Sequence, residues 1–123
     1  MRRIAAIRAA AKKKGIDLFI NARTDLFLGQ EGDPARSVGD ALARAKAYAR
    51  AGASGLFIPG LQDDALIGRI CAGAELPVNV MVMDRVPSNG RLAELGVARV
   101  SYGPIPYISA VNALKEDALK VLS

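Results

Sequence analysis

The sequence predicts an α/β fold, in which parallel strands alternate with helices. Short apolar runs recur along the chain, and each is followed by a longer segment whose apolar residues repeat at helical spacing. The runs are apolar throughout instead of at every second residue, which is typical of strands buried on both faces of a parallel sheet. Because strands and helices alternate, right-handed crossovers are expected. The sequence therefore predicts four strand–helix units after an opening helix.

The opening helix is predicted over residues 2–14, where Ile4, Ile7 and Ala11 recur at helical spacing. Lysines fill its last turn, at the negative end of the helix dipole, and a glycine ends it. The first strand is then predicted over residues 18–22 and is expected to be buried on both faces.

The first strand ends in a polar triplet, Arg23, Thr24 and Asp25. In α/β folds the carboxyl ends of parallel strands form the ligand site, so this triplet is the first candidate site. Arg23 is the strongest candidate, because a guanidinium binds an oxyanion through two parallel hydrogen bonds and keeps its charge. A structural ion pair with Asp25 is the alternative.

The loop after the first strand, residues 22–32, carries the apolar residues Leu26, Phe27 and Leu28. An apolar loop at the ligand edge of a sheet can act as a lid. The alternative is that these side chains pack on neighbouring loops or on another subunit. No periodicity decides between the two predictions.

Asp33 and Pro34 predict the start of the second helix, with the carboxylate as N-cap and proline at the first helical position. This helix has one apolar stripe, formed by Val38, Leu42, Ala45 and Ala49. The second strand is predicted over residues 55–59. The third helix is predicted over residues 62–72, with two aspartates near its positive end.

The third strand, residues 77–82, contains the polar Asn79 within a buried run. Ser88 is predicted to cap a short helix before the fourth strand, residues 97–101. The last helix is predicted over residues 105–122, with a helical apolar period through Ile108, Val111, Leu114, Ala118 and Val121.

The composition limits the chemistry open to this chain. A chain of 123 residues is expected to form a single domain or a piece of one, here a single segment over residues 1–123. Histidine is absent and Cys71 is the single cysteine, which excludes histidine-based triads, internal disulfides and the usual zinc sites. Cys71 falls on the apolar side of the third helix, which favours a core residue over a nucleophile.

The charge and hydropathy indicate which partners are expected. The net charge of +5 suits a small anionic ligand. Nucleic-acid binding is not expected, because aromatic residues are few and basic residues are spread over separate helices. No run approaches the ~20 apolar residues that cross a bilayer, and no signal peptide is recognised. A cytoplasmic protein without membrane contact is therefore expected.

Four segments carry a resemblance to a known family: residues 20–25 (INARTD), 50–60 (RAGASGLFIPG), 76–81 (LPVNVM) and 95–103 (LGVARVSYG). In this order they resemble motifs of the isocitrate lyase and phosphoenolpyruvate mutase superfamily. The strand–helix alternation alone allows either a doubly wound sheet or a barrel. The resemblance implies a (β/α)8 TIM barrel, of which this chain would be the C-terminal half, with strands five to eight.

A half-barrel would expose one face of its sheet and two unpaired edges. A homo-oligomer, or pairing with a missing half-barrel, is therefore expected. The resemblance also implies an oligomer in which subunits swap the final helix, here residues 105–122.

Five residues are predicted to contribute to substrate binding, and for Arg23 and Asn79 the resemblance implies the role. Arg23 matches a family arginine that contacts the carboxylate or phosphoryl group of the substrate. Asn79 matches an asparagine of the seventh strand that hydrogen-bonds the substrate, with a structural amide as the alternative. Thr24 and Asp25 are expected to orient Arg23 or to be ordinary loop residues. Gly103 can let backbone N–H groups approach an anion, although a plain turn is favoured.

The resemblance also implies Mg²⁺, which the family binds through acidic residues on its early strands, and a mobile catalytic loop after the fourth strand. This chain has neither the Asp-x-Asp signature nor that loop, so no metal ligand is assigned in it. Several carbon–carbon lyases of the family carry a glutamate after the sixth strand, where this chain has Pro59 and Gly60. This departure favours the mutase-like and phosphonomutase-like branch.

The sequence thus favours part of a lyase or isomerase that acts on small 2-oxo or phospho-enol carboxylic acids with magnesium-assisted enolate chemistry. No catalytic residue is assigned. Because the metal-binding half is missing from this chain, we expect the chain alone to be inactive. The alternative is a non-catalytic α/β module for anion binding or assembly.

Overall fold

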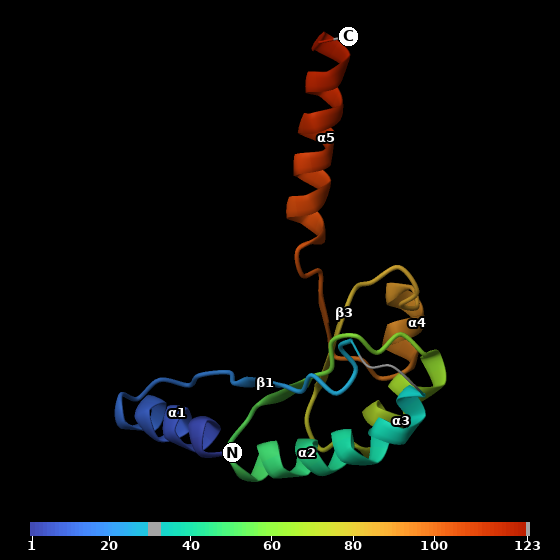
Figure 1. Ribbon diagram of the computed structural model, residues 1–123. Coiled ribbons are helices and arrows are strands. Elements are labelled where there is room, and N and C mark those ends of the chain that lie inside the picture. The colour runs from blue at the N-terminus through green and yellow to red at the C-terminus, as the bar shows by residue number, and fades with distance from the viewer. Residues whose placement is uncertain (30–32, 123) are drawn as a thin grey trace.

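The computed structural model describes residues 1–29 and 33–122 (Figure 1). Helices and strands alternate as predicted. In chain order the elements are α1 (Arg2–Lys13), β1 (Asn21–Arg23), the 3₁₀ helix η1 (Pro34–Ser37), α2 (Val38–Arg50), β2 (Gly55–Phe57), α3 (Asp64–Gly73), β3 (Val78–Met81), α4 (Asn89–Glu94), β4 (Arg99–Ser101) and α5 (Ile105–Leu122).

The four strands form one parallel sheet with the order β1-β2-β3-β4. Each strand therefore pairs with the strands before and after it in the chain. A doubly wound sheet has a point at which this order reverses, whereas a barrel does not. The predicted α/β fold is confirmed, and the strand order is that of a barrel segment.

One face of the sheet, here called the helix face, packs against the helices that curve round it in Figure 1. Ala22, Leu56 and Val78 share one register row on this face, and each is at most 6% exposed. Leu56 and Val78 join buried residues of α2 and α3 in one core, among them Val38, Ala41, Ala45, Ile67 and Ile70. Burial of each large aliphatic side chain stabilises the fold by about 1.5–3 kcal/mol.

The opposite face, here called the open face, carries the next register row: Arg23, Phe57, Asn79 and Arg99. Successive side chains of a strand point to opposite faces, so these four residues point away from the core. Arg23 and Arg99 are exposed, Phe57 is half-buried and Asn79 is buried. The open face is thus more polar and less covered than the helix face.

The first strand differs from its prediction. Residues 18–22 were expected to form a strand buried on both faces, but β1 spans Asn21–Arg23, and Leu18 and Phe19 are 39% and 56% exposed. β1 is an edge strand with a neighbour only in β2. Because no described residue pairs with its other edge, the segment before β1 is not enclosed, and the predicted burial is wrong.

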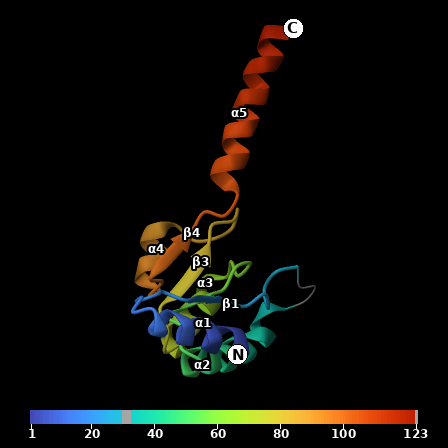
Figure 2. The ribbon, with the colours of Figure 1, turned by 90° about the vertical axis from the view of Figure 1, so that its left-hand side faces the viewer.

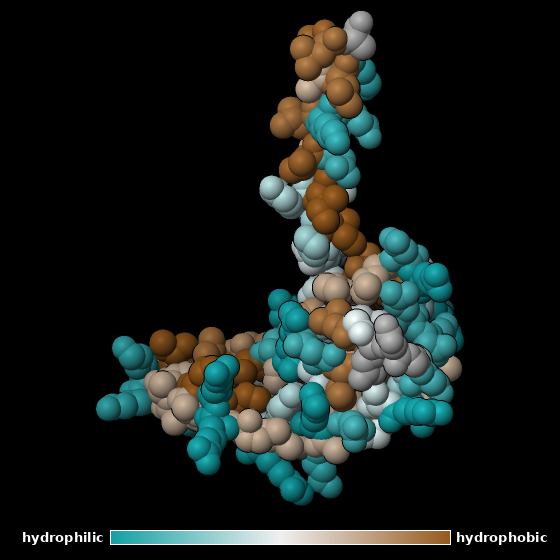
Figure 3. All heavy atoms as spheres, in the orientation of Figure 1, coloured by the Kyte–Doolittle hydropathy of each residue, from teal (hydrophilic) through white to brown (hydrophobic). Residues whose placement is uncertain are grey.

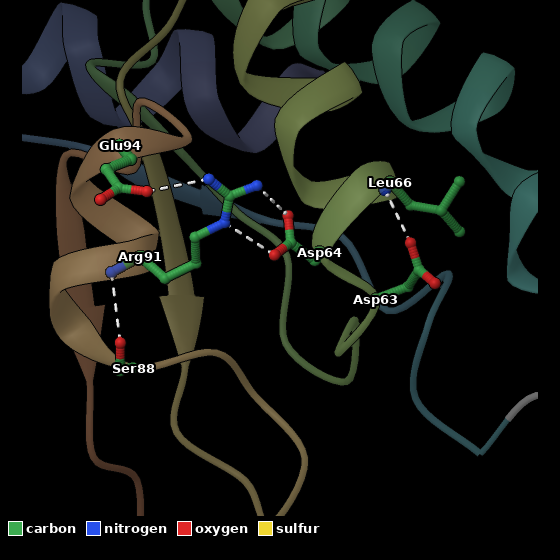
Figure 4. A network of polar contacts seen from close by, with 6 residues as sticks. All are labelled: Asp63, Asp64, Leu66, Ser88, Arg91 and Glu94. Atoms are coloured by element: carbon green, nitrogen blue, oxygen red, sulfur yellow. Dashed lines mark hydrogen bonds and ion pairs between the residues drawn. The ribbon is translucent and has the colours of Figure 1, made fainter.

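Capping hydrogen bonds mark three helix starts. The caps of Asp33 and Ser88 are as predicted, whereas the third helix was predicted from residue 62 and α3 begins at Asp64, after an Asp63 cap. The Asp33 side chain accepts a hydrogen bond from the Ala35 amide at 2.8 Å, and the Asp63 side chain accepts one from the Leu66 amide at 2.9 Å. The Ser88 hydroxyl accepts one from the Arg91 amide at 3.3 Å (Figure 4). Each bond satisfies an amide that has no partner within the helix.

Helix α1 is tied to the rest of the fold mainly through Arg8. Its Nε donates to the Gly52 carbonyl at 2.9 Å and its Nη2 to the Ser54 hydroxyl at 2.8 Å. Gly52 has φ +93°, and a Cβ there would lie 2.9 Å from the Arg8 Cγ. Glycine is therefore required both by the backbone and by the approach of Arg8. Ala11 is the one buried residue of α1.

Arg91 links α4 to the start of α3, as Figure 4 shows. Its Nε and Nη2 bond both carboxylate oxygens of Asp64, at 2.8 and 3.0 Å, and its Nη1 bonds Glu94 at 2.8 Å. The hydrogen bond from Arg91 lowers the pKa of the Asp64 carboxyl below its usual value.

Helix α5 has the predicted bounds, Ile105–Leu122, but none of its residues is buried. It projects away from the body of the molecule (Figures 1 and 2). Apolar side chains form a band along it in Figure 3, and Tyr107, Leu114, Val121 and Leu122 are each at least 72% exposed. Within residues 1–29 and 33–122, no helix has both the length and the apolar character to cross a bilayer.

The described part of the loop after β1 packs on the fold. Phe27 is 7% exposed and belongs to the core, and Leu26 packs against it. Gly60 lies close beneath this loop, since a Cβ there would be 2.3 Å from the Phe27 carbonyl oxygen. These contacts agree with packing on neighbouring loops rather than with a lid. Residues 30–32 of the predicted loop lie outside the described residues.

Candidate functional site

Arg23 ends β1 on the open face of the sheet. Its Nε donates a hydrogen bond to the Asp25 carboxylate at 2.5 Å, and the two side chains are 53% and 65% exposed. The predicted alternative, an ion pair with Asp25, is therefore formed. Among the described residues none bonds the two terminal nitrogens of Arg23. These nitrogens remain available to an oxyanion while Asp25 holds the Nε.

Asn79 lies on the same register row as Arg23, with Phe57 of β2 between them. Neighbouring strands are about 4.8 Å apart, so the two backbones are separated by roughly 10 Å. Asn79 is only 2% exposed, and its amide is hydrogen-bonded to the Ser101 hydroxyl of β4, with Nδ2 at 3.1 Å and Oδ1 at 3.2 Å. Ser101, which sequence reasoning did not single out, thus fixes the amide of Asn79.

Thr24 points to the opposite side, because it follows Arg23 by one residue in an extended segment. It is 1% exposed, and its hydroxyl accepts a hydrogen bond from the Arg44 Nη1 at 3.1 Å. The Tyr48 hydroxyl donates to the Arg23 carbonyl at 3.4 Å. Helix α2 therefore anchors the end of β1 through Arg44 and Tyr48. Helical periodicity had placed Arg44 outside the buried stripe and gave no sign of this role.

Gly103 lies in the turn between β4 and α5 with φ +53°. A Cβ at this position would lie 3.1 Å from the Met81 sulfur. Both the positive φ and the close approach of Met81 account for glycine as a turn residue. An approach of its backbone N–H to an anion stays a prediction.

Two adjoining hollows lie where the strands end. The first has a volume of about 530 Å³ and is lined by Phe27, Pro34, Gly60, Leu61, Gln62, Asp63 and Arg85. The second has a volume of about 480 Å³ and is lined by Gln62, Met81, Val82, Met83, Asp84, Arg85, Pro104 and Ile105. The five residues predicted to bind substrate line neither hollow. Sequence reasoning missed both Gln62 and Arg85, which occupy loops without a recognisable motif.

The described residues do not fit a magnesium site. No group of three or more His, Cys, Asp or Glu side chains in residues 1–29 and 33–122 is arranged to hold a metal ion. Asp25, the acid closest in sequence to Arg23, is already paired with that arginine. Cys71 is half-buried against the core, and its burial raises the pKa of the thiol, so the core role predicted for it is consistent with its surroundings.

Comparison with known proteins places this geometry in a family. The profile of the family described as phosphoenolpyruvate phosphomutase matches residues 1–122. The chain belongs to the phosphoenolpyruvate phosphomutase family. The resemblance drawn from the sequence motifs is thereby confirmed.

The chain is also similar to three proteins whose names are known. A proposed phosphonomutase from Burkholderia cenocepacia superposes with a TM-score of 0.91 and 50% identity, over 96% of this chain and 48% of the other. A 2,3-dimethylmalate lyase, a member of the phosphoenolpyruvate mutase and isocitrate lyase superfamily, has a TM-score of 0.80 at 23% identity, over 97% of this chain and 41% of that one, and shows the fold alone. An oxaloacetate decarboxylase from Ectopseudomonas mendocina is 35% identical over 78 residues, 62% of this chain and 27% of the decarboxylase.

The chain thus spans less than half the length of each of these proteins. Its four parallel strands and their helices correspond to a partial domain of the phosphoenolpyruvate phosphomutase family. This partial coverage accounts for the open face, because the remaining length of the relatives has no counterpart here.

Proposed function

We propose that residues 1–123 form one segment of a phosphoenolpyruvate phosphomutase-like barrel and supply part of a site for a small carboxylic or phospho-enol acid. The observation that supports this proposal is the shared register row of Arg23 and Asn79 on the open face. In a closed barrel this face becomes the interior, and the carboxyl ends of the strands hold the ligand.

Each predicted residue has a distinct role in this proposal. The terminal nitrogens of Arg23 bind the carboxylate or phosphoryl oxygens, while Asp25 fixes the orientation of the guanidinium through Nε. The amide of Asn79, held by Ser101, donates a hydrogen bond without adding charge. Thr24 supports the strand end from the helix face. Gly103 contributes backbone only.

The names of similar proteins, a phosphonomutase and an oxaloacetate decarboxylase, support a small 2-oxo or phospho-enol acid as the substrate class. Mg²⁺, when bound, would stabilise the negative charge of an enolate-like species. Because the described residues do not fit this ion, we place its ligands outside this chain. A cytoplasmic location is part of the same proposal.

A second candidate function is a non-catalytic module for anion binding or assembly. The lack of a metal-binding acidic group among the described residues favours it. Under this alternative Arg23 still binds an anion, but no bond of the ligand is broken.

Turnover measurements distinguish the two functions. The purified chain is assayed with phosphoenolpyruvate, oxaloacetate and methylisocitrate, with and without Mg²⁺. The chain alone is expected to be inactive. When the rest of the barrel is supplied as a separate polypeptide, the enzyme proposal expects turnover that falls at least about tenfold in Arg23→Lys, because the ammonium cannot form the paired hydrogen bonds of a guanidinium. Arg99→Lys, on the same open face, is the matched control and is expected to change the rate less than about twofold. Ligand binding that depends on Arg23, without any turnover even when the rest of the barrel is supplied, supports the module.

We also propose that α5 packs against a second copy of this chain. Its apolar side chains lie along one side of the helix and are exposed in the single chain, and such a surface favours association. Val111→Lys places a charge on this side, whereas Ala113→Lys places one about 200° further round the helix. Sedimentation is expected to show a dimer or larger species for the unmodified chain and for Ala113→Lys, and a smaller species for Val111→Lys. A monomeric unmodified chain contradicts the proposal.

A further inference from the structure

The two hollows at the carboxyl edge of the sheet meet at Gln62 and Arg85, which line both of them. Gln62 belongs to the connection between β2 and α3, and Arg85 to the connection between β3 and α4. Their positions follow the ends of two neighbouring strands, where α/β folds bind ligands. Volumes of about 530 and 480 Å³ lie within the range of small-molecule sites.

Arg85 is free to bind a ligand. It is exposed, and within residues 1–29 and 33–122 it forms neither an ion pair nor a hydrogen bond. Gln62 is half-buried, and among the described residues its Nε2 has one hydrogen-bond acceptor, the Met83 sulfur at 3.7 Å, which is a weak acceptor. Both residues thus line the hollows, and neither side chain has a strong hydrogen-bond partner among the described residues.

Two carboxylates also line the hollows, and neither neutralises Arg85. Asp63, in the first hollow, uses one oxygen to cap α3 through the Leu66 amide. Asp84, in the second hollow, is exposed. No ion pair within 4.0 Å joins either of them to Arg85 in the part of the chain described. Arg85 therefore presents an unpaired guanidinium between the hollows.

We infer that Gln62 and Arg85 form an anion-binding site for the carboxylate or phosphate group of a small acid. This site is separate from Arg23 and Asn79, which line neither hollow. The Arg85 guanidinium binds two oxygens of the anion, and the Gln62 amide donates to one of them. The inference does not depend on the proposed function, because it concerns different residues.

The test is a calorimetric and NMR titration of the full chain with inorganic phosphate and, separately, with oxalate. Arg85→Gln is expected to weaken binding of both anions at least about tenfold, because it removes a charge-assisted pair of hydrogen bonds. Arg69→Gln removes the same charge from an exposed position of α3 outside the hollows and is expected to change binding less than about twofold. Gln62→Leu is expected to give an intermediate loss, and the shifted amide signals are expected to cluster in residues 60–63 and 83–86.

Several outcomes overturn the inference. They are the absence of anion binding by the unmodified chain, equal weakening by Arg85→Gln and Arg69→Gln, and amide shifts that cluster elsewhere. Arg23→Lys distinguishes the two proposals: it is expected to leave phosphate binding at Arg85 within about twofold while it reduces turnover or binding at the open face. If Arg23→Lys abolishes phosphate binding and Arg85→Gln does not, this inference fails and the proposed function stands.

Discussion

The two faces of the sheet are built from alternate residues of the same strands, yet they differ in every physical respect. The helix face consists of apolar side chains that are almost fully buried, and its polar member, Thr24, is hydrogen-bonded to Arg44. The open face holds two exposed arginines, Arg23 and Arg99, and the buried amide of Asn79, all on one register row. The comparison teaches that the buried core of this segment lies on one face of the sheet, while the other face stays polar and less covered.

The largest expected effect separates the faces within a single strand. Leu56→Ala removes a fully buried side chain of the helix face and is expected to lower the free energy of unfolding by about 2–5 kcal/mol, because a cavity is left in the core. Phe57→Ala, at the next residue, removes a half-buried ring from the open face. It is expected to lower the free energy of unfolding by less than Leu56→Ala does. Urea denaturation measures both. An equal or greater loss for Phe57→Ala would show that the open face is covered.

A smaller effect is expected at Asn79. Ser101→Ala removes the partner of an amide that is 2% exposed and is expected to cost about 1–3 kcal/mol, the penalty for a buried polar group without a partner. Ser101→Thr keeps the hydroxyl and is the control. If the threonine variant is destabilised as much as the alanine variant in urea, packing rather than the hydrogen bond is responsible.

Removal of a hydrogen-bonded hydroxyl from the helix face is expected to lower the free energy of unfolding by still less. Thr24→Val removes the acceptor of the Arg44 hydrogen bond, but Arg44 is exposed and can be solvated instead. We expect a loss of about 1 kcal/mol. In a double-mutant cycle with Arg44→Leu, the second change is expected to add little once the first is made. If the two substitutions change the free energy of unfolding additively, the hydrogen bond between Thr24 and Arg44 does not contribute to stability.

The smallest effect concerns the link between α3 and α4, which lies outside both faces. The hydrogen bond between Arg91 and Asp64 lowers the pKa of the Asp64 carboxyl, so the folded state favours the ionised carboxylate. The stabilisation is therefore present above the unfolded pKa, near 4, and is lost as the pH falls through the folded value. Asp64→Asn is expected to be slightly less stable than the unmodified chain at pH 6, and equally stable once the pH has fallen below the pKa of Asp64 in the folded state. A difference that persists at low pH contradicts this assignment.

Element type and order could be predicted from this sequence because the local signals are strong. Asp33 and Ser88 form the predicted caps, and α5 has the predicted bounds. The burial of Leu18 and Phe19 was mispredicted because an apolar run specifies a strand but not whether a neighbour covers it. That neighbour is not supplied by the described chain.

The candidate site was predictable only in part. Arg23 and Asn79 stand out because polar residues interrupt or end apolar runs, and the register places them on one face. The orientation of Thr24 follows from simple alternation once the strand is located. Gln62 and Arg85 could not be found in this way, because loop residues carry no periodicity and their proximity depends on how the connections fold.

The attachment of α1 through Arg8 has a consequence for the dynamics of the chain. A helix with one buried residue, joined by two hydrogen bonds from one guanidinium, can detach as a unit while the sheet stays intact. Its amide protons are therefore expected to exchange with deuterium much faster than those of β2 and β3. In Arg8→Ala a protease is expected to cut the peptide bonds of α1 faster than in the unmodified chain.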